Sequence, residues 1–481
     1  MQSYVKNLSN NKIQREVKGL NIEKRNTDTR DGFKSNWGFI LACIGSAVGM
    51  GNIWRFPIMV SVWGGLTFLL PYFLFVILIS SSGVPGEFAL GRMTGAGPIG
   101  AFGYCTEMRG NKRAGQIIGL LPVIGSMALA IGYTVVVGWI FKYTFMGISG
   151  SLYSLGTDMN LIGGTFGAAA PDTETLSESI SAVLGGQGNN MWLAIGLAVS
   201  AFIMIMGIGG GIEKANKFMM PALFLLLVGL GVYIFTLPGS HEGYSYIFTL
   251  NLDKLKDLKL WIFAFGQAFF SLSVAGNGSV IYGSYLPKKE DLVFSSRNVA
   301  FFDTAAALLA ALVIIPSMAS AGGDLSKGGP GLMFVWLVNV FNGMPGGRIV
   351  GMIFFICVLF AGVSSLVNLY EAPVATMQEV FKLKRAPACI VTCGFGCAAA
   401  LAIQGITGQW MDAVSIYICP LGAAIAGFMF FWVCRKERAL EEINTGRKKP
   451  VGESVIFLGK YIYVPMAVIA LIAGALLNGI G

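Results

Sequence analysis

The chain has 481 residues, of which 54% are hydrophobic and only 12% are charged, and its mean hydropathy is +0.68. This composition excludes a soluble globular protein with a single anchor and indicates a chain that crosses the lipid bilayer many times. The formal net charge is +9, but cytoplasmic loops of membrane proteins are rich in Lys and Arg, so the charge does not indicate nucleic-acid binding.

The chain begins with a polar segment, residues 1–35, which carries eight Lys or Arg residues and no apolar signal-peptide core. We therefore expect a cytoplasmic N-terminal tail. Eleven apolar segments of membrane-spanning length follow: 36–60, 65–90, 115–148, 191–209, 215–237, 258–286, 298–320, 347–381, 386–404, 409–436 and 454–480. With the tail inside, the cytoplasmic segments hold 27 Lys or Arg residues and the outside loops hold five, so we expect the C-terminus outside.

The first span is interrupted at Gly45–Pro57, which reads GSAVGMGNIWRFP. Three glycines within seven residues weaken a helix, since each costs about 1 kcal/mol relative to alanine. Backbone freed in this way must be surrounded by protein or by a water-filled cavity, because lipid cannot satisfy it. Close helix packing through Gly45 and Gly49, a GxxxG pair, is the alternative, but packing alone does not require Asn52 and Arg55.

The sixth span contains a second interruption, which reads SLSVAGNG at 271–278. Eleven spans divide into two units of five, 36–237 and 258–436, and one additional helix at 454–481. The interrupted helices, the first and the sixth, then open the two units. Interrupted helices in corresponding positions are typical of transporters that bind their substrate at the middle of the membrane. The predicted fold is an all-α polytopic membrane protein with an inverted five-plus-five repeat.

The eighth span carries a polar stripe, because five of its residues share one helix face: Ala361, Ser364, Ser365, Asn368 and Glu371. Such a stripe in a buried membrane helix either bonds neighbouring helices or lines a cavity, and the stripe alone does not separate the two.

Four motifs resemble those of a known family: RDGFKSNWGFILACIGSAVGMGNIWRFP (30–57), GVPGEFALGR (83–92), GQAFFSLS (266–273) and AGVSS (361–365). With them the chain resembles, from Arg30 to about Pro450, the bacterial amino-acid transporters of the neurotransmitter:sodium symporter family, which have the leucine-transporter fold. The resemblance implies a secondary active transporter and not an enzyme. It would lie in the inner membrane of a bacterium, as a monomer or homodimer, and take up sodium ions with a neutral amino acid by alternating access. A channel and a non-transporting sensor are the alternatives, but paired gates argue against the first and a tail without a recognisable output domain argues against the second.

The resemblance also implies two sodium sites. The first would use the Ala47 carbonyl, the side chains of Asn52, Ser271 and Asp303, and the carboxylate of the substrate. The second would use five oxygens: the carbonyls of Gly45, Val48 and Ala361 and the hydroxyls of Ser364 and Ser365. Chloride is not expected to be required. Chloride-dependent relatives have an asparagine where this chain has the acidic Asp303, and a serine one helical turn later, where this chain has Ala307.

Monoamine-transporting relatives have an aspartate where this chain has Gly49, so here the substrate is expected to bring its own carboxylate. That group would meet the Gly49 and Gly51 amides and the Tyr133 hydroxyl. The resemblance implies a binding site, for a hydrophobic or aromatic amino acid, made by Ala47, Gly49, Gly51, Leu129, Tyr133, Phe270, Ser271, Ser273, Gly276, Asn277, Ser365 and Leu369. Gly276 and Asn277 depart from the pattern of many bacterial relatives, which have phenylalanine and glycine there.

Two ion pairs would act as gates. Arg55 and Asp412 resemble the outer gate, above an aromatic lid of Tyr133 and Phe270. Arg30 and Glu379 resemble the inner gate, with Tyr285 as its aromatic partner. Taken singly, any of these charges is as readily a plain interfacial residue.

Two further residues are unusual for apolar spans. Glu87 lies within the second span, where a carboxylate is costly, and is expected to bond backbone freed by the break at 271–278. Pro221 lies ten residues after Gly211 at the start of the fifth span. It either kinks that helix or, as in some relatives, marks a helix that unwinds.

Overall fold

The computed structural model describes residues 32–49, 51–167, 177–178, 188–274, 278–320, 331–477 and 479. Arg30, Gly276 and Asn277, to which roles were assigned above, lie outside these residues. The described part of the chain is helical and contains no strand.

The helices, with 3-10 and π-helical segments labelled η, are α2 (Asn36–Ala47), η2 (Gly51–Arg55), α3 (Phe56–Trp63), α4 (Leu66–Ser81), α5 (Gly83–Thr94), α6 (Pro98–Glu107), α7 (Lys112–Ile118), α8 (Leu120–Ser149), η3 (Tyr153–Leu155), α9 (Met159–Gly167), α11 (Asn190–Ile205), η4 (Ile208–Ile212), α12 (Glu213–Phe235), α13 (Ser240–Ile247), η5 (Lys254–Lys256), α14 (Leu258–Ser271), α15 (Gly278–Ser284) and α16 (Leu292–Ser320). They continue with η7 (Leu332–Trp336), α17 (Leu337–Gly343), α18 (Gly347–Val380), α19 (Arg385–Ala402), η8 (Gln404–Ile406), α20 (Thr407–Ala413), η9 (Val414–Ile418), α21 (Cys419–Phe428), η10 (Met429–Val433), α22 (Lys436–Asn444), α23 (Ser454–Leu458), η11 (Gly459–Tyr463) and α24 (Val464–Leu477).

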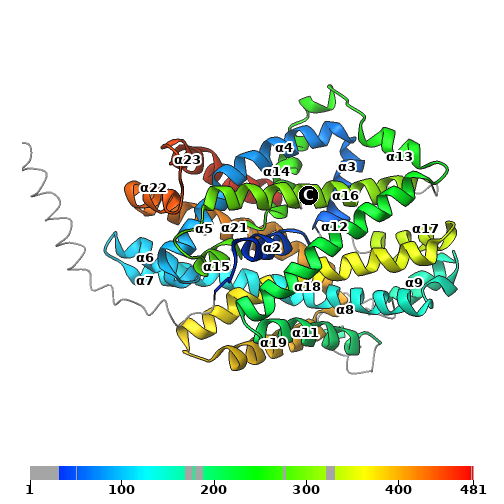
Figure 1. Ribbon diagram of the computed structural model, residues 1–481, viewed down its shortest axis with the longest axis horizontal. Helices are drawn as coiled ribbons and strands as arrows, with labels where there is room; N and C mark the ends of the chain where they lie inside the picture. Colours follow the sequence, from blue (N-terminus) through cyan, green and yellow to red (C-terminus); the bar gives the residue numbers. More distant parts are fainter. Residues whose placement is uncertain are drawn as a thin grey trace, which may run out of the picture.

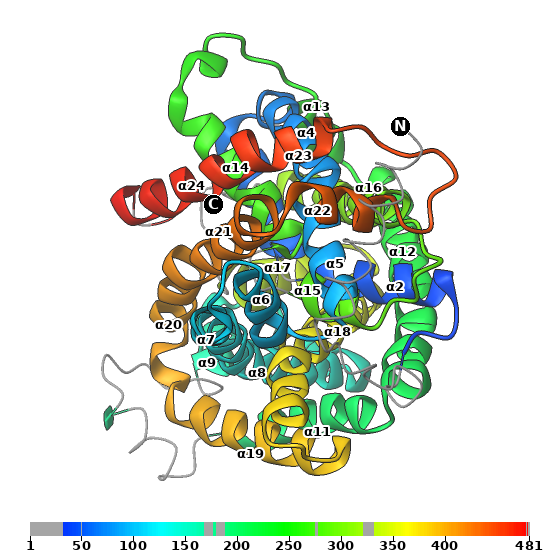
Figure 2. The ribbon, with the colours of Figure 1, turned by 90° about the vertical axis from the view of Figure 1, so that its left-hand side faces the viewer.

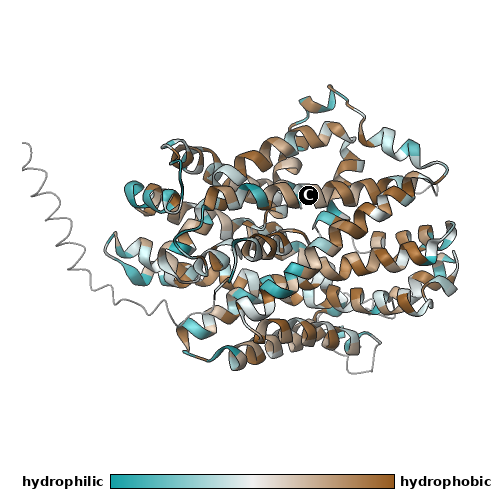
Figure 3. Cartoon of the chain, in the orientation of Figure 1, coloured by the Kyte–Doolittle hydropathy of each residue, from teal (hydrophilic) through white to brown (hydrophobic). Residues whose placement is uncertain are grey.

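Among the described residues, eight helices are long and apolar enough to cross a membrane. A ninth span is the pair Asn36–Ala47 and Gly51–Trp63, whose halves are bent by 64°. The long helices run side by side in Figure 1, and apolar residues predominate along them in Figure 3. The predicted class, a polytopic all-α membrane protein, is confirmed.

The two remaining predicted spans, 191–209 and 258–286, are shorter apolar helices, Asn190–Ile205 and Leu258–Ser271. The first ends early because Gly207 has a φ of 89°, a left-handed conformation that a right-handed helix cannot include. The second ends at the predicted interruption. One further apolar helix, Leu332–Gly343, was not predicted.

Both predicted interruptions are present. The helix α2 ends at Ala47, Val48 is extended with a ψ of 97°, and helical structure resumes at Gly51. The other break separates α14, which ends at Ser271, from α15, which begins at Gly278.

The fifth predicted span is continuous across Pro221, because α12 runs from Glu213 to Phe235 with this proline inside it. Gly211 lies in the short segment η4 just before it. The structure thus contains no unwound turn between Glu213 and Phe235.

The helix α15 lies near the middle of the bundle, with α5 and α18 beside it (Figure 2). The close approach of α5 depends on Gly91: a Cβ there would lie 1.9 Å from the Val280 carbonyl oxygen and 2.8 Å from the Ser284 amide nitrogen. Both are backbone atoms, so neither can move aside by changing rotamer.

We therefore expect Gly91→Ala to destabilise the protein by roughly 1–3 kcal/mol, the usual cost of overpacking. Thermal unfolding of the purified variant in detergent should show a lower midpoint. Gly394→Ala in α19 is the matched control, because a Cβ there would meet nothing within 4 Å. Equal midpoints for the two variants would contradict this account of the α5–α15 contact.

Candidate functional site

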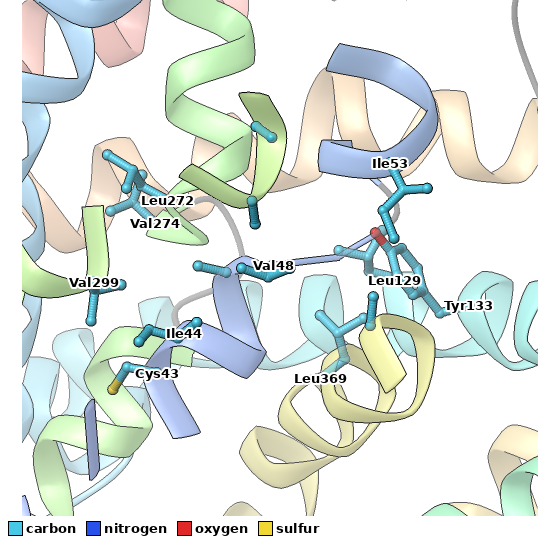
Figure 4. Packing of buried hydrophobic residues seen from close by; sticks show 14 of the residues in the cluster. Cys43, Ile44, Val48, Ile53, Leu129, Tyr133, Leu272, Val274, Val299 and Leu369 are labelled. Atoms are coloured by element: carbon cyan, nitrogen blue, oxygen red, sulfur yellow. The ribbon is translucent and has the colours of Figure 1, made fainter. Parts of the chain in front are cut away.

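A small cavity of about 40 Å³ lies between the two helix breaks and the helices α8 and α18. Figure 4 shows part of its wall, with Leu129 and Tyr133 from α8 near Leu369 from α18. Its lining residues are Ser46, Ala47, Gly49, Gly51, Asn52, Leu129, Tyr133, Phe270, Ser271, Ser273, Ser365, Asn368 and Leu369. The structure thus brings together ten of the twelve residues expected to bind substrate, and the other two, Gly276 and Asn277, are outside the described residues.

The three side chains assigned to the first sodium site form one hydrogen-bonded cluster. Asn52 donates from Nδ2 to Asp303 Oδ1 at 2.8 Å and to Ser271 Oγ at 3.2 Å. Ser271 donates from Oγ to Asp303 Oδ2 at 2.6 Å. All three are at most 1% exposed, so their polar atoms depend on partners within the protein.

This cluster connects the helix breaks. Asn52 lies in η2 just after the first break, Ser271 is the last residue of α14 before the second, and Asp303 lies in the middle of α16. Asn52 also accepts a hydrogen bond at Oδ1 from the Gly49 amide at 3.1 Å. The neighbouring oxygens are of the hard carboxylate, amide and hydroxyl types that suit a hard cation.

The residues assigned to the second sodium site also lie together. Ser364 and Ser365 are 1% and 4% exposed, and Ser364 donates from Oγ to the Ala361 carbonyl at 3.1 Å. A Cβ on Gly45 would lie 3.1 Å from Ser364 Cβ, and one on Gly49 would lie 2.6 Å from Ser365 Oγ. The first break therefore lies directly against the hydroxyl-bearing face of α18.

Ser365 Oγ is buried and has no hydrogen-bond partner in the described part of the chain. Leaving such a group unpaired costs about 1–3 kcal/mol. A cation or an ordered water at this position would remove that cost.

The two breaks are also joined directly. Ser273 has a φ of 55°, an uncommon conformation for a residue other than glycine. It donates from Oγ to the Ser46 carbonyl at 2.8 Å, which satisfies backbone that α2 no longer bonds at its end.

Sequence reasoning missed two polar residues here. Asn368 lines the cavity, is 4% exposed and has no partner for Oδ1 among the described residues. Gln267 donates from Nε2 to the Gly51 carbonyl at 3.3 Å. The polar stripe already contained Asn368, and the motif GQAFFSLS contained Gln267, so both signals were present in the sequence.

Arg55 was assigned above to an outer gate, and its guanidinium lies 5.1 Å from the centre of the Phe270 ring. Asp412 is exposed in α20. No ion pair of 4.0 Å or less joins Arg55 to Asp412, two residues that the structure describes fully. The predicted pair is therefore separated in this conformation, while the predicted lid residues Tyr133 and Phe270 both line the cavity.

At the opposite end, Tyr285 donates from its hydroxyl to Glu371 Oε1 at 2.7 Å. Glu371 is completely buried and forms a two-pronged ion pair with Arg385, at 2.9 and 2.8 Å. The sequence indicated neither the pair nor its link to Tyr285. Glu379, the predicted gate residue, accepts from the Gly97 amide at 2.8 Å.

The predicted role of Glu87 gains no support here. The carboxylate is 2% exposed, and both of its oxygens lack a partner in the part of the chain that the structure describes. No hydrogen bond joins it to the described residues of 271–278.

Removing one member of a buried ion pair leaves an uncompensated charge, at a cost of about 3–5 kcal/mol. We expect Arg385→Met to lower the unfolding midpoint strongly and Glu371→Gln combined with Arg385→Met to restore part of it. Arg438→Met is the control, because its ion pair with Glu441 is 40% and 64% exposed, a setting in which pairs contribute at most about 1 kcal/mol. Equal effects of Arg385→Met and Arg438→Met would contradict this reading.

Comparison with known proteins fits this geometry. The sequence model of the sodium:neurotransmitter symporter family matches residues 30–155 and 173–477. The chain is 29% identical over 437 residues to an uncharacterized sodium-dependent transporter of Methanocaldococcus jannaschii, covering 86% of this chain and 84% of that protein. It is 28% identical over 458 residues to the uncharacterized sodium-dependent transporter YhdH of Bacillus subtilis, covering 90% and 95%. Its fold is similar to that of MhsT in complex with L-phenylalanine, with a TM-score of 0.78, 32% identity and coverage of 92% and 99%. The chain therefore belongs to the sodium:neurotransmitter symporter family and is a sodium-dependent transporter, not an enzyme.

Proposed function

We propose that this transporter carries a neutral amino acid with a hydrophobic or aromatic side chain, together with sodium, by alternating access. The observation that carries the proposal is the lining of the cavity: none of the described residues that line it is charged. The wall combines apolar side chains, among them Leu129, Phe270 and Leu369, with polar groups at the helix breaks. The similarity to MhsT in complex with L-phenylalanine supports the same class of substrate.

The helix break would receive the amino-acid carboxylate. The described wall offers no Lys or Arg to an anion, so backbone amides and hydroxyls must supply the donors. The Gly49 amide already donates to Asn52, which leaves the Gly51 amide and the Tyr133 hydroxyl as the expected donors. With glycine at position 49, the carboxylate that neighbours the first sodium ion comes from the substrate itself.

Two sodium ions are proposed. The first would lie among Ala47, Asn52, Ser271, Asp303 and the substrate carboxylate, so ion and substrate would stabilise each other. The second would be bound by the carbonyls of the first break and of Ala361 together with Ser364 and Ser365. The unpaired Ser365 hydroxyl supports this placement.

Alternating access would use the two gates. We propose that Arg55, which lies against Phe270, pairs with Asp412 when the outer side closes, and that Arg30 and Glu379 close the inner side.

The asymmetry of Lys and Arg supports a cytoplasmic N-terminus in the inner membrane of a bacterium and a C-terminus outside. An inverted repeat of 36–237 and 258–436, and a monomer or homodimer, remain part of the proposal.

The function is tested with purified protein in two assays. Thermal unfolding with each of the twenty amino acids, with and without sodium, should show stabilisation by hydrophobic or aromatic amino acids only when sodium is present. Uptake of the best stabiliser into proteoliposomes should then depend on an inward sodium gradient. Stabilisation by a charged amino acid, or uptake without sodium, would contradict the proposal.

Ser364→Ala combined with Ser365→Ala would remove two of the five expected oxygens of the second site. We expect the half-saturating sodium concentration to rise at least about ten-fold, or transport to be lost, because each oxygen is hard to replace in a dry site. Ser200→Ala is the control, since that buried hydroxyl bonds only within its own helix, to the Gly196 carbonyl at 2.9 Å. An unchanged sodium dependence would place the ion elsewhere.

We also propose that chloride is not required, because the Asp303 carboxylate, 0% exposed and bonded to Asn52 and Ser271, supplies the negative charge beside the first sodium ion. Uptake should be equal in chloride and in gluconate. Asp303→Asn should abolish uptake, and Asp303→Asn combined with Ala307→Ser should restore it only when chloride is supplied. Normal chloride-free uptake by Asp303→Asn would show that this role of Asp303 is wrong.

A further inference from the structure

Asn216 is a buried polar residue to which the sites above assign no role. It lies in the first turn of α12 and is 1% exposed. Its Nδ2 donates to the Ile212 carbonyl of the preceding turn at 2.9 Å. Its Oδ1 has no hydrogen-bond partner within the described part of the chain.

That unpaired oxygen faces the first helix break. A Cβ on Gly45 would lie only 1.9 Å from Asn216 Oδ1 and 3.1 Å from Ser364 Cβ. The carboxamide of α12, the glycine of α2 and the serine of α18 therefore meet at one point. A side chain at position 45 would displace the amide oxygen from this place.

The helix α12 is held against α2 in this register. Figures 1 and 2 both show the two helices side by side. One turn before Asn216, Glu213 accepts from the Lys34 amide at 2.6 Å and from Ser35 Oγ at 2.8 Å, at the start of α2. Lys217 donates to Glu213 at 2.6 Å.

A role in helix packing alone does not explain this oxygen. A buried acceptor without a donor costs about 1–3 kcal/mol, and an apolar side chain would avoid that cost. Of the charged groups nearest in sequence, Lys214 is exposed, and Glu213 and Lys217 are paired with each other. No hydrogen bond joins any of them to the Asn216 oxygen. Within the described residues no donor meets this oxygen, whereas a bound cation would satisfy it.

We propose that the carboxamide oxygen of Asn216 is an additional ligand of the second sodium ion, contributed by α12. This rests on the proposed function, which places that ion among the carbonyl of Gly45 and the hydroxyls of Ser364 and Ser365. Asn216 would be its sixth oxygen. A third helix would then bind the ion besides α2 and α18, and release of the ion would require α12 to release its oxygen.

The test is the sodium dependence of Asn216→Leu, which keeps a side chain of similar size and removes the oxygen. Sodium binding is measured by thermal stabilisation without substrate and by sodium-driven uptake. We expect the half-saturating sodium concentration to rise about ten-fold in both assays, which corresponds to about 1.4 kcal/mol. Asn298→Leu is the matched control, because the Asn298 amide makes the same bond to the preceding turn, to the Phe294 carbonyl at 2.8 Å, away from the proposed sites.

A second variant separates binding from packing. Asn216→Asp keeps an oxygen and adds a negative charge, so it should lower the half-saturating sodium concentration where Asn216→Leu raises it. The proposal is overturned if Asn216→Leu binds sodium within two-fold of the unmodified protein. If Asn216→Leu does not fold, the same result with Asn216→Asp overturns it. It is equally overturned if both variants weaken sodium binding.

The double variant of Ser364 and Ser365 distinguishes a failure of the second sodium site from a failure of the Asn216 assignment. If it raises the half-saturating sodium concentration and Asn216→Leu does not, the second site stands and only the assignment of Asn216 fails. If neither changes the sodium dependence, the ion lies elsewhere, and the assignment of Asn216 fails with the site.

Discussion

Backbone amides and carbonyls that no helix satisfies are very costly within a membrane, and the organisation of this protein follows from that constraint. Its two broken helices expose such groups around one cavity. They are tolerated because each break lies against side chains with complementary polar atoms. Ser273 satisfies the Ser46 carbonyl across the gap, and Asn52 accepts from the Gly49 amide.

The same constraint accounts for the polar residues that surround the breaks. Asp303 in α16 and the serine pair in α18 are buried deeply enough that each would be unfavourable alone. Asp303 is bonded to Asn52 and Ser271 beside the breaks, and the serine pair lies against the first break. The glycines of the first break have a second function, since they let α12 and α18 approach the chain closely enough for side-chain oxygens to reach it.

Much of this arrangement could be predicted from the sequence. Glycine-interrupted apolar segments marked both breaks, and the position of Gly49, Ser271 and Ser365 within long motifs was sufficient to assign them to one cavity. The spans with continuous apolar sequence were also predicted closely, because length and hydropathy determine them. The end of α11 was not, since its stop depends on the backbone conformation of a single residue, Gly207.

The pairings could not be predicted. Arg385 reads as one more basic residue in a loop, and Glu371 as one more polar residue on a stripe, until folding brings them within 2.8 Å. Asn216 lies in an apolar helix, and only the structure shows that its oxygen faces a glycine 171 positions earlier in the chain. Such contacts depend on how the helices pack, which periodicity within one helix does not specify.

The ion pair of Glu371 and Arg385 also has a consequence for rate. Tyr285 follows α15 directly and donates to Glu371, while Arg385 donates to the Met204 carbonyl at 2.7 Å. The Met204 carbonyl of α11 and Arg385 of α19 form one end of this network, Glu371 of α18 is its centre, and Tyr285 connects it to the second broken helix. Any movement that separates α15 from α18 must first break a charge-assisted hydrogen bond in a dry environment. We therefore expect this network to contribute an enthalpic barrier to the conformational cycle, so that turnover rises steeply with temperature even when every binding site is saturated.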